Sequence, residues 1–169
     1  VEGTMGGGKT YYVVEQCLKA MREGAIVHTN IAFREDVLEE MGLLHLLVKL
    51  PPDYKQWETV LNAGEEGAEN VWAVDESSVL FHMYDQLATK SDQSKREFFE
   101  LLTMVRKAGL ETYFIAQHAG NVDVAIRNLA ESRVMCVNQE RLPFLGPIIA
   151  FVLGRFKRIH KNQVGLRLG

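Results

Sequence analysis

Hydrophobic and polar positions change their spacing along the chain in a way that predicts helices and strands in alternation. Over residues 10–23 the apolar positions recur every three or four residues, as on one face of a helix, and Gly24 supplies a C-terminal stop. Further helices are predicted over residues 35–41, 56–62, 94–109 and 122–129. Short apolar runs predict buried strands over residues 25–33, 43–50, 71–74, 112–116 and 133–137. This alternation predicts an α/β fold, with a mainly parallel sheet and helices on both faces.

The chain has the length and composition of one globular domain, which we expect to cover residues 1–169. Hydrophobic residues make up 47% of the chain and charged residues 24%, which is enough to form a core. Residues 142–169 are predicted to form a strand or hairpin extension. The apolar run over residues 142–153 is too short to span a bilayer as a helix, and an interfacial or inter-subunit patch is the alternative for it.

Charge and side-chain chemistry narrow the classes of function. The formal net charge of −3 gives no general attraction to nucleic acid, so any DNA contact would be local. Cys17 and Cys136 lie far apart in apolar surroundings, and we interpret them as reduced, buried packing residues, with a disulfide as the alternative. The aromatic residues Tyr11, Tyr12 and Trp72 are predicted to pack in the protein rather than to stack on bases.

The glycine-rich segment at the start of the chain carries the strongest chemical signal. Residues 3–10 read G-T-M-G-G-G-K-T, which fits the phosphate-binding pattern G-x-x-x-x-G-K-[ST]. Its glycines let the backbone close around a phosphate, and the helix that follows turns its positive end toward the anion. Lys9 is predicted to reach the β- and γ-phosphates, and the Thr10 hydroxyl to hold Mg²⁺. The predicted nucleotide-binding residues are Gly3, Thr4, Met5, Gly6, Gly7, Gly8, Lys9, Thr10 and Tyr11.

The place of this loop in the chain is unusual. A phosphate-binding loop normally follows a central β-strand, but only Val1 and Glu2 precede Gly3 in this sequence. We therefore expect the first strand of the sheet to be truncated here. A flexible glycine-rich tail is the alternative, and the Lys-Thr pair at a fixed offset before a helix argues against it.

Two acidic residues follow the predicted strand over residues 71–74. Carboxylates at the C-terminal edge of a parallel strand face the ligand crevice of an α/β sheet. Asp75 is therefore predicted to hold Mg²⁺, directly or through water, and Glu76 to orient and deprotonate the attacking water. Without the glycine-rich loop, the same two acids would be interpreted as a solvated strand end.

Three further positions are candidates for roles linked to nucleotide hydrolysis or to a partner. Gln117 ends the next predicted strand, where it either senses the γ-phosphate and its water or simply caps the strand; we expect His118 beside it to be exposed. Arg127, on a predicted helix, is either an arginine finger across a subunit interface or a surface arginine. The basic run over residues 155–161 either contacts nucleic acid or an anionic membrane surface, or protects a strand edge.

With these residues placed, the chain resembles the Zot family (zonula occludens toxin-like proteins), which includes the gene I assembly proteins of filamentous bacteriophages. The resemblance spans nearly the whole chain and is carried by residues 3–10, 74–76, 106–109 and 142–146 and by the series Gln117, Asp123 and Arg127. It implies a P-loop ATPase domain related to the FtsK–HerA group of DNA pumps. The nucleotide roles carry onto Lys9, Thr10, Asp75 and Glu76, and a sensor role onto Gln117.

The same resemblance implies a cellular setting. Members of the family sit on the cytoplasmic side of the bacterial inner membrane, and a membrane-spanning helix usually follows the ATPase domain. ATP and Mg²⁺ are the implied cofactors, and ATP rather than GTP rests on the resemblance alone. The implied partners are further copies of the chain, arranged in a ring, and phage coat and export proteins, with phage single-stranded DNA as a candidate. The toxin of the family name refers to regions beyond this domain.

Two functions from different classes fit the sequence. We expect an oligomeric motor ATPase that drives assembly and extrusion of a filamentous phage. The alternative is a nucleotide-gated scaffold that recruits partners with little hydrolysis, because a phosphate-binding loop predicts binding rather than turnover. A small-molecule kinase is disfavoured, since no arginine-rich lid is evident and residues 80–94 contain no arginine.

Overall fold

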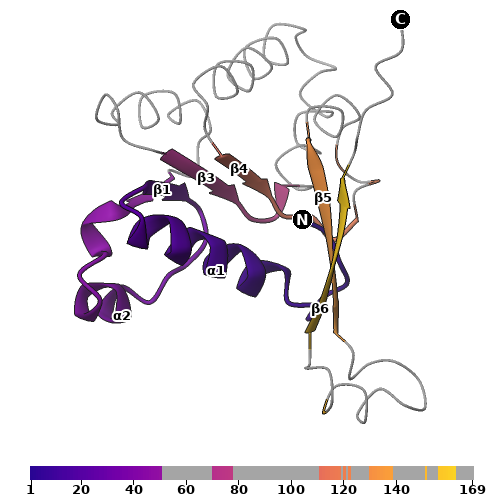
Figure 1. Ribbon diagram of the computed structural model, residues 1–169, viewed down its shortest axis with the longest axis horizontal. Coiled ribbons are helices and arrows are strands. Elements are labelled where there is room, and N and C mark those ends of the chain that lie inside the picture. Colours follow the sequence, from indigo (N-terminus) through magenta and orange to yellow (C-terminus); the bar gives the residue numbers. More distant parts are fainter. Residues whose placement is uncertain are drawn as a thin grey trace, which may run out of the picture.

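The described part of the chain is a parallel β-sheet packed against a long helix, with a two-stranded ribbon beside it (Figure 1). The computed structural model describes residues 1–50, 70–77, 111–118, 120, 122, 130–138, 151 and, for the backbone, 156–162. Its elements are α1 (Lys9–Arg22), β1 (Ile26–Thr29), α2 (Glu35–Glu40), the 3₁₀ turn η1 (Leu44–Leu46), β2 (Leu47–Lys49), β3 (Asn70–Val74), β4 (Glu111–Phe114), β5 (Ser132–Asn138) and β6 (Phe156–Asn162). The predicted α/β fold is confirmed.

Four strands form the main sheet in the order β2-β1-β3-β4, and all three pairings are parallel. The register sets Val27 of β1 opposite Val71 of β3, and Trp72 of β3 opposite Thr112 of β4. Parallel strands end at the same edge of a sheet, so the residues that follow β1, β3 and β4 come together there. Figure 1 shows that this edge lies at the same end of the molecule as the start of α1.

The first two residues connect this sheet to the ribbon. Glu2 forms parallel bridges with both Ala116, just after β4, and Met135 of β5. Its backbone N–H donates to the Val134 carbonyl at 2.8 Å, and its carbonyl accepts from the Cys136 N–H at 2.8 Å. β5 then pairs with β6 in the antiparallel sense. The spatial order is therefore β2-β1-β3-β4, residues 1–2, β5, β6, and a short stretch of parallel backbone leads into the glycine-rich loop.

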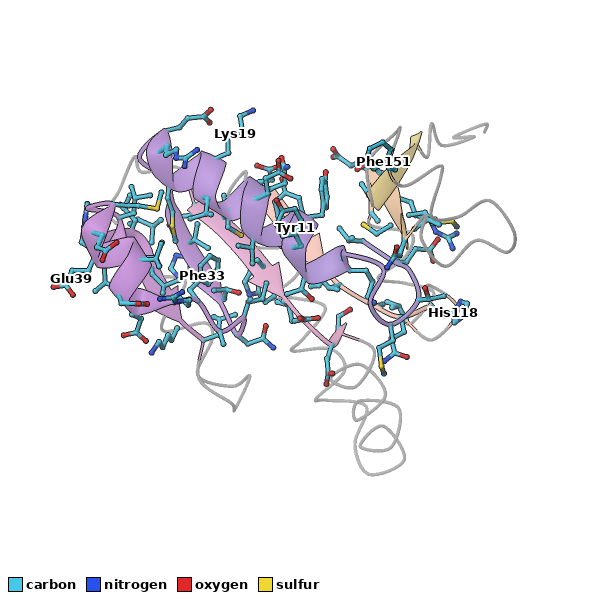
Figure 2. All side chains as sticks on the ribbon, turned by 90° about the horizontal axis from the view of Figure 1, so that it is seen from below. Tyr11, Lys19, Phe33, Glu39, His118 and Phe151 are labelled. Atoms are coloured by element: carbon cyan, nitrogen blue, oxygen red, sulfur yellow. The ribbon has the colours of Figure 1, made fainter. Side chains whose placement is uncertain are left out.

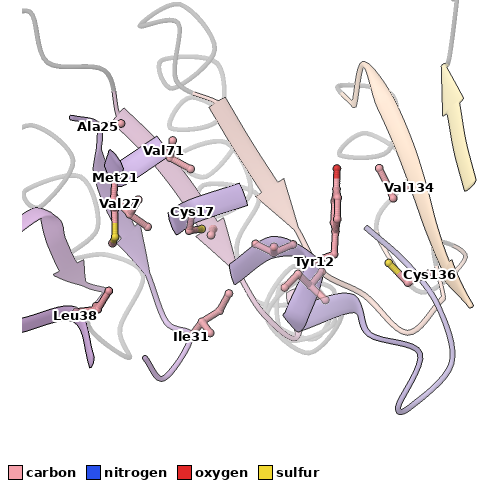
Figure 3. Packing of buried hydrophobic residues seen from close by; sticks show 13 residues of the cluster. Tyr12, Cys17, Met21, Ala25, Val27, Ile31, Leu38, Val71, Val134 and Cys136 are labelled. Carbon is pink, nitrogen blue, oxygen red and sulfur yellow. The ribbon is translucent and has the colours of Figure 1, made fainter. Parts of the chain in front are cut away.

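Helix α1 packs on one face of the sheet (Figure 3). The helix contributes Tyr12, Val13, Cys17 and Met21 to the core, at the spacing expected for one helical face. Tyr12 points from the start of α1 toward Val134 and Cys136 of β5, so this one helix packs on the main sheet and on the ribbon (Figure 3). The cysteines are free and buried, as predicted. Burial raises the pKa of the Cys17 thiol to about 12, which keeps it protonated and unreactive.

The side chains of β3 are also buried on the opposite face of the sheet. Trp72 and Val74 of β3 are fully buried, and Trp72 meets the edge of Phe114 at a ring-centroid distance of 5.6 Å. Strands buried on both faces are typical of a parallel sheet covered on both sides. The helices predicted over residues 56–62, 94–109 and 122–129 lie outside the described residues, apart from Val122.

Both described helices end in the same way. Gly24 and Gly42 adopt φ values of 95° and 70°, and the residue after each donates its N–H back to the helix, Ala25 to Ala20 and Leu43 to Leu38. These bonds define the glycine-terminated Schellman motif, and they confirm the predicted stops. Within the described ranges, no helix is both long enough and apolar enough to cross a membrane.

Three sequence predictions need correction. The strand predicted over residues 25–33 is limited to Ile26–Thr29, because the chain turns away at Asn30. The strand predicted over residues 43–50 begins as the 3₁₀ turn η1, because the turn at Gly42 first directs the chain across the end of α2. Tyr11 was expected to pack, but its side chain is 62% exposed on the outside of α1 (Figure 2).

Candidate functional site

The glycine-rich loop lies at the C-terminal edge of the sheet and leads directly into α1. Within it the Gly7 N–H donates to the Thr4 carbonyl at 2.9 Å, which closes the loop on itself. Gly8 is the residue before the helix and has a left-handed φ of 86°. Thr4, Met5 and Gly6 are exposed, so the outer part of the loop is open to solvent. The loop is therefore ordered at its base and accessible at its tip.

Two glycines of the loop touch the backbone of β5. A Cβ atom at Gly3 would lie 2.3 Å from the Cys136 carbonyl oxygen, and the φ of 152° at Gly3 disfavours any other residue. A Cβ atom at Gly7 would lie 2.9 Å from the same oxygen. The spacing of the motif thus has a structural cause in addition to its chemical one, because the loop can rest on β5 only where side chains are absent.

The positive N-terminal end of the α1 dipole is not neutralised by a side chain of the helix itself. Among the described residues no side chain caps it, and its first turn contains no acidic residue, whereas Lys19 and Arg22 complement the negative end in the last turn. An uncapped helix start that follows a glycine-rich loop presents backbone N–H groups to an anion. The local electrostatics therefore favour an anion at this helix start.

The structure brings together Thr10 and Asp75, which are 65 residues apart. The Thr10 hydroxyl donates to Oδ2 of Asp75 at 3.0 Å, across the gap between α1 and the end of β3. Lys9 beside it donates from Nζ to the Thr4 carbonyl at 3.1 Å, so the lysine is folded over the loop. The cation, the hydroxyl and the carboxylate that the motifs predicted therefore lie around one short stretch of backbone.

Glu76 has an unusual backbone conformation. Its φ of 51° is the one positive value among the non-glycine residues that the structure describes. Its N–H donates to Oδ1 of Asp75 at 2.8 Å, and the next residue, Ser77, is buried and donates from both its N–H and its hydroxyl to the Ile115 carbonyl. Left-handed conformations of this kind cost energy and recur at functional sites. The exposed Glu76 therefore lies between two residues, Asp75 and Ser77, that are each held by hydrogen bonds.

Asn30 is a further residue at this edge that the motifs did not indicate. It follows β1, and its side chain accepts from the Asp75 N–H at 2.7 Å and donates to the Asp75 carbonyl at 3.1 Å. Thr29 before it is buried and donates its hydroxyl to the Ala73 carbonyl at 2.6 Å. The only signal in the sequence was a polar Thr-Asn pair at the end of an apolar strand, which is too common to single out.

The other predicted residues differ in what the structure describes. Gln117 and His118 follow β4 at the same edge, and both are exposed, which confirms the expectation for His118. Figure 2 shows His118 at the end of the molecule that carries the glycine-rich loop. Arg127 and Asp123 lie outside the described residues, so the role predicted for Arg127 stays a prediction.

The β5 side of the loop is fixed by an ion pair. Arg133 donates from Nε and from one terminal nitrogen to the two carboxylate oxygens of Glu2, each at 2.5 Å. The Glu2 side chain is 6% exposed, and this hydrogen bonding raises the pKa of Arg133. Further along β5, Asn138 donates to the Gly6 carbonyl at 3.4 Å. The backbone immediately before the loop is therefore tied to β5 at several points.

The oxygen atoms at this edge suit a hard cation. Mg²⁺ typically takes one or two protein oxygens and completes its shell with water and substrate phosphates, and Thr10 with Asp75 supplies such a pair beside the loop. Among the described residues there is no cluster of three or more His, Cys, Asp or Glu side chains that could hold a metal without such help. The residues present therefore fit a cation that arrives together with phosphates.

A parallel sheet with a glycine-rich loop before its long helix, and an acidic pair at a neighbouring strand end, defines an α/β protein with a candidate phosphate-binding site. The chain belongs to the zonular occludens toxin (Zot) family, whose model matches residues 1–144. Membership links it to phage-related proteins with an ATPase-type domain and implies nucleotide binding in general terms. No curated protein and no solved structure matches the chain.

Proposed function

We propose that this chain is an ATP-binding and ATP-hydrolysing motor domain for the assembly and extrusion of a filamentous phage, with its single-stranded DNA, through the bacterial inner membrane. The observation that carries the proposal is the hydrogen bond of 3.0 Å between Thr10 and Asp75. It joins the end of the glycine-rich loop to an acidic strand end 65 residues away, which a glycine-rich tail without function would have no reason to do.

Each residue of the site has a role in this proposal. Residues 3–8 and Tyr11 surround the triphosphate and nucleoside, and Lys9 leaves the Thr4 carbonyl to contact the β- and γ-phosphates. Thr10 and Asp75 hold Mg²⁺, which neutralises charge on the phosphates when bound. Glu76 accepts a proton from the attacking water, and Gln117 orients that water from the next strand end.

The decisive experiment compares wild type with Lys9→Ala in nucleotide binding and steady-state hydrolysis. We expect the substitution to lower hydrolysis by at least about 100-fold, because positioned charge at the transferring phosphate is a large part of catalysis. Lys19→Ala, which removes an exposed lysine at the far end of α1, is the matched control and should leave hydrolysis unchanged. Equal hydrolysis in wild type and Lys9→Ala would overturn the assignment of the site.

We further propose that the motor works as a ring of identical chains, with Arg127 as the arginine finger. Hydrolysis per molecule should then rise with protein concentration, and Arg127→Ala should abolish that rise. Activity per molecule that is independent of concentration would remove the ring from the proposal. Phage coat and export proteins are the proposed partners, at the cytoplasmic face of the inner membrane, with attachment through a segment beyond this chain.

The second candidate is a nucleotide-gated scaffold. The exposed, strained Glu76 is the residue that distinguishes it from a motor. A scaffold needs bound nucleotide but not proton abstraction by Glu76. Glu76→Gln should therefore stop phage production if the chain is a motor and leave it intact if the chain is a scaffold.

A further inference from the structure

The side chain of Asn30 continues the sheet where the backbone of β1 has turned away. Thr29 lies opposite Ala73 in the β1–β3 pairing, so Asn30 would be the next residue of the strand. Its carboxamide instead meets Asp75, with 2.7 Å from the Asp75 nitrogen to Oδ1 and 3.1 Å from Nδ2 to the Asp75 carbonyl oxygen. One side chain thus pairs with both backbone polar groups of the residue that bonds to Thr10.

The backbone around Asn30 is itself held in place. The buried Thr29 hydroxyl donates to the Ala73 carbonyl at 2.6 Å and accepts from the Ile31 N–H at 3.0 Å. Ile31 belongs to the buried core cluster, and the Thr29 carbonyl accepts from the Leu50 N–H at 2.9 Å. The turn is therefore rigid on both sides of Asn30, and the carboxamide acts from a fixed support.

The carboxamide holds the backbone that carries two carboxylates, those of Asp75 and Glu76. With its backbone held by Asn30, Asp75 directs Oδ2 to the Thr10 hydroxyl at 3.0 Å and Oδ1 to the Glu76 N–H at 2.8 Å. Glu76 adopts its left-handed φ of 51° between this bond and the buried Ser77. A strained residue keeps its conformation only where its neighbours determine it, and Asn30 is the determinant on the β1 side.

We propose that Asn30 is a positioning residue for the acidic pair, which sets Asp75 toward the cation and Glu76 toward the water. This inference rests on the proposed nucleotide function of the site. Asn30 is exposed, so its two hydrogen bonds contribute little to the stability of the fold, and their main effect is on the geometry of the site. An amide is required at this position because one atom must accept and the other must donate.

The test uses Asn30→Ala, which removes both bonds, and Asn30→Asp, which keeps the shape but turns an oxygen toward the Asp75 carbonyl. Arg34→Ala is the matched control, because Arg34 lies on the same connecting segment and pairs on the surface with Asp36. The two readouts are the affinity for a fluorescent ATP analogue with and without Mg²⁺, and the separate values of kcat and KM. Thermal unfolding establishes that each variant is folded.

Without Mg²⁺, we expect both Asn30 variants to bind the analogue with an affinity within about twofold of wild type. Adding Mg²⁺ should raise the affinity of the variants by about tenfold less than it raises the affinity of wild type. We expect kcat to fall about 10- to 100-fold, because a small displacement of catalytic groups costs that much. The KM for ATP with Mg²⁺ should rise by about the factor of affinity that is lost. The Asn30 inference is overturned if both variants keep the wild-type Mg²⁺ gain and the wild-type kcat.

The outcome separates this inference from the proposed function. If wild type binds nucleotide with a Mg²⁺ gain but does not hydrolyse it, the motor proposal fails while the Mg²⁺ gain still decides the role of Asn30. If wild type hydrolyses ATP and the Asn30 variants do so equally well, the motor proposal stands and the positioning role falls. Absence of any nucleotide binding by wild type would overturn both.

Discussion

The glycine-rich loop is held from two sides, and the two sides use different kinds of contact. On the β5 side the contacts come from backbone and from a nearly buried ion pair: Gly3 rests against the Cys136 carbonyl, and Glu2 is paired with Arg133. On the β3 side the contacts come from exposed or half-buried side chains, Thr10, Asp75 and Asn30. The comparison indicates that β5 supports the loop, and that the side chains on the β3 side are the candidates for its chemistry.

This division has a physical reason. Backbone contacts and buried pairs are strong because they are desolvated, and for the same reason they cannot exchange partners during a reaction. Exposed polar side chains gain less from one another, so a ligand can replace a partner at modest cost. Substitutions on the β5 side should therefore lower stability, whereas substitutions on the β3 side should lower nucleotide binding at nearly constant stability.

The largest effect is expected from Gly3→Ala. The added carbon would lie 2.3 Å from the Cys136 carbonyl oxygen, at a φ of 152° that other residues rarely adopt. We expect the free energy of unfolding to fall by about 2–4 kcal/mol, measured by urea denaturation. Gly120→Ala is the control, since no atom of the described residues lies within 4 Å of its added carbon, and it should change stability by less than about 0.5 kcal/mol. A fully stable Gly3→Ala protein would mean that β5 does not support the loop.

A smaller loss of stability is expected from Arg133→Ala. The substitution leaves the Glu2 carboxylate, 6% exposed, without its cation, and we expect a cost of about 1–3 kcal/mol because Arg133 itself is partly solvated. The double variant Glu2→Gln with Arg133→Met removes both charges and should recover part of that loss. If the double variant is no more stable than Arg133→Ala, the ion pair is not what fixes the backbone before the loop.

In contrast to the β5-side variants, Thr10→Ala should lower Mg²⁺-dependent nucleotide binding far more than it lowers stability. It removes one half-buried hydrogen bond, so we expect the free energy of unfolding to fall by only about 1 kcal/mol. The gain in nucleotide affinity that Mg²⁺ provides should be lost, whereas Thr10→Ser, which keeps the hydroxyl, should retain it. Isothermal titration with and without Mg²⁺ measures this difference. Retention of the Mg²⁺ gain in Thr10→Ala would contradict the assignment of chemistry to the β3 side.

The smallest effect is expected at His28, which lies in the interior, opposite Trp72 of β3. It is buried on β1, and this burial holds its pKa below the usual value of 6.5, although its Nε2 meets Oδ1 of Asn70 at 3.1 Å. Below pH 6.5 the unfolded chain therefore takes up a proton before the folded chain does. The stability that neutral His28 contributes is present above that pH and is lost as the pH falls toward the folded-state pKa.

The measurement for His28 is the free energy of unfolding at a series of pH values between about 7 and 5. We expect His28→Phe to show a shallower loss of stability over this range than wild type. His45→Ala removes an exposed histidine and should follow the wild-type curve. Identical slopes for wild type and His28→Phe would show that water reaches this part of the sheet.

Much of the site could be predicted from local sequence because its parts are contiguous. The loop, the lysine and the threonine occupy eight successive positions, and Asp75 and Glu76 directly follow a short apolar strand. Asn30 could not be predicted, because its role depends on which strand lies beside β3. The strand predicted over residues 43–50 was partly wrong for a related reason, since the turn after Gly42 determines its first residues as a 3₁₀ turn.

The sequence by itself determined the fold class, the family, the free state of the cysteines and the position of the glycine-rich loop before the first helix, because each depends on residue type and local spacing. The tertiary structure alone decided the strand order, in which residues 1–2 lie between β4 and β5, and the antiparallel pairing of β5 with β6. It also decided that Asn30 meets Asp75 and that Gly3 rests on Cys136. Contacts between distant residues depend on how whole elements pack, and residue spacing along the chain does not specify that packing.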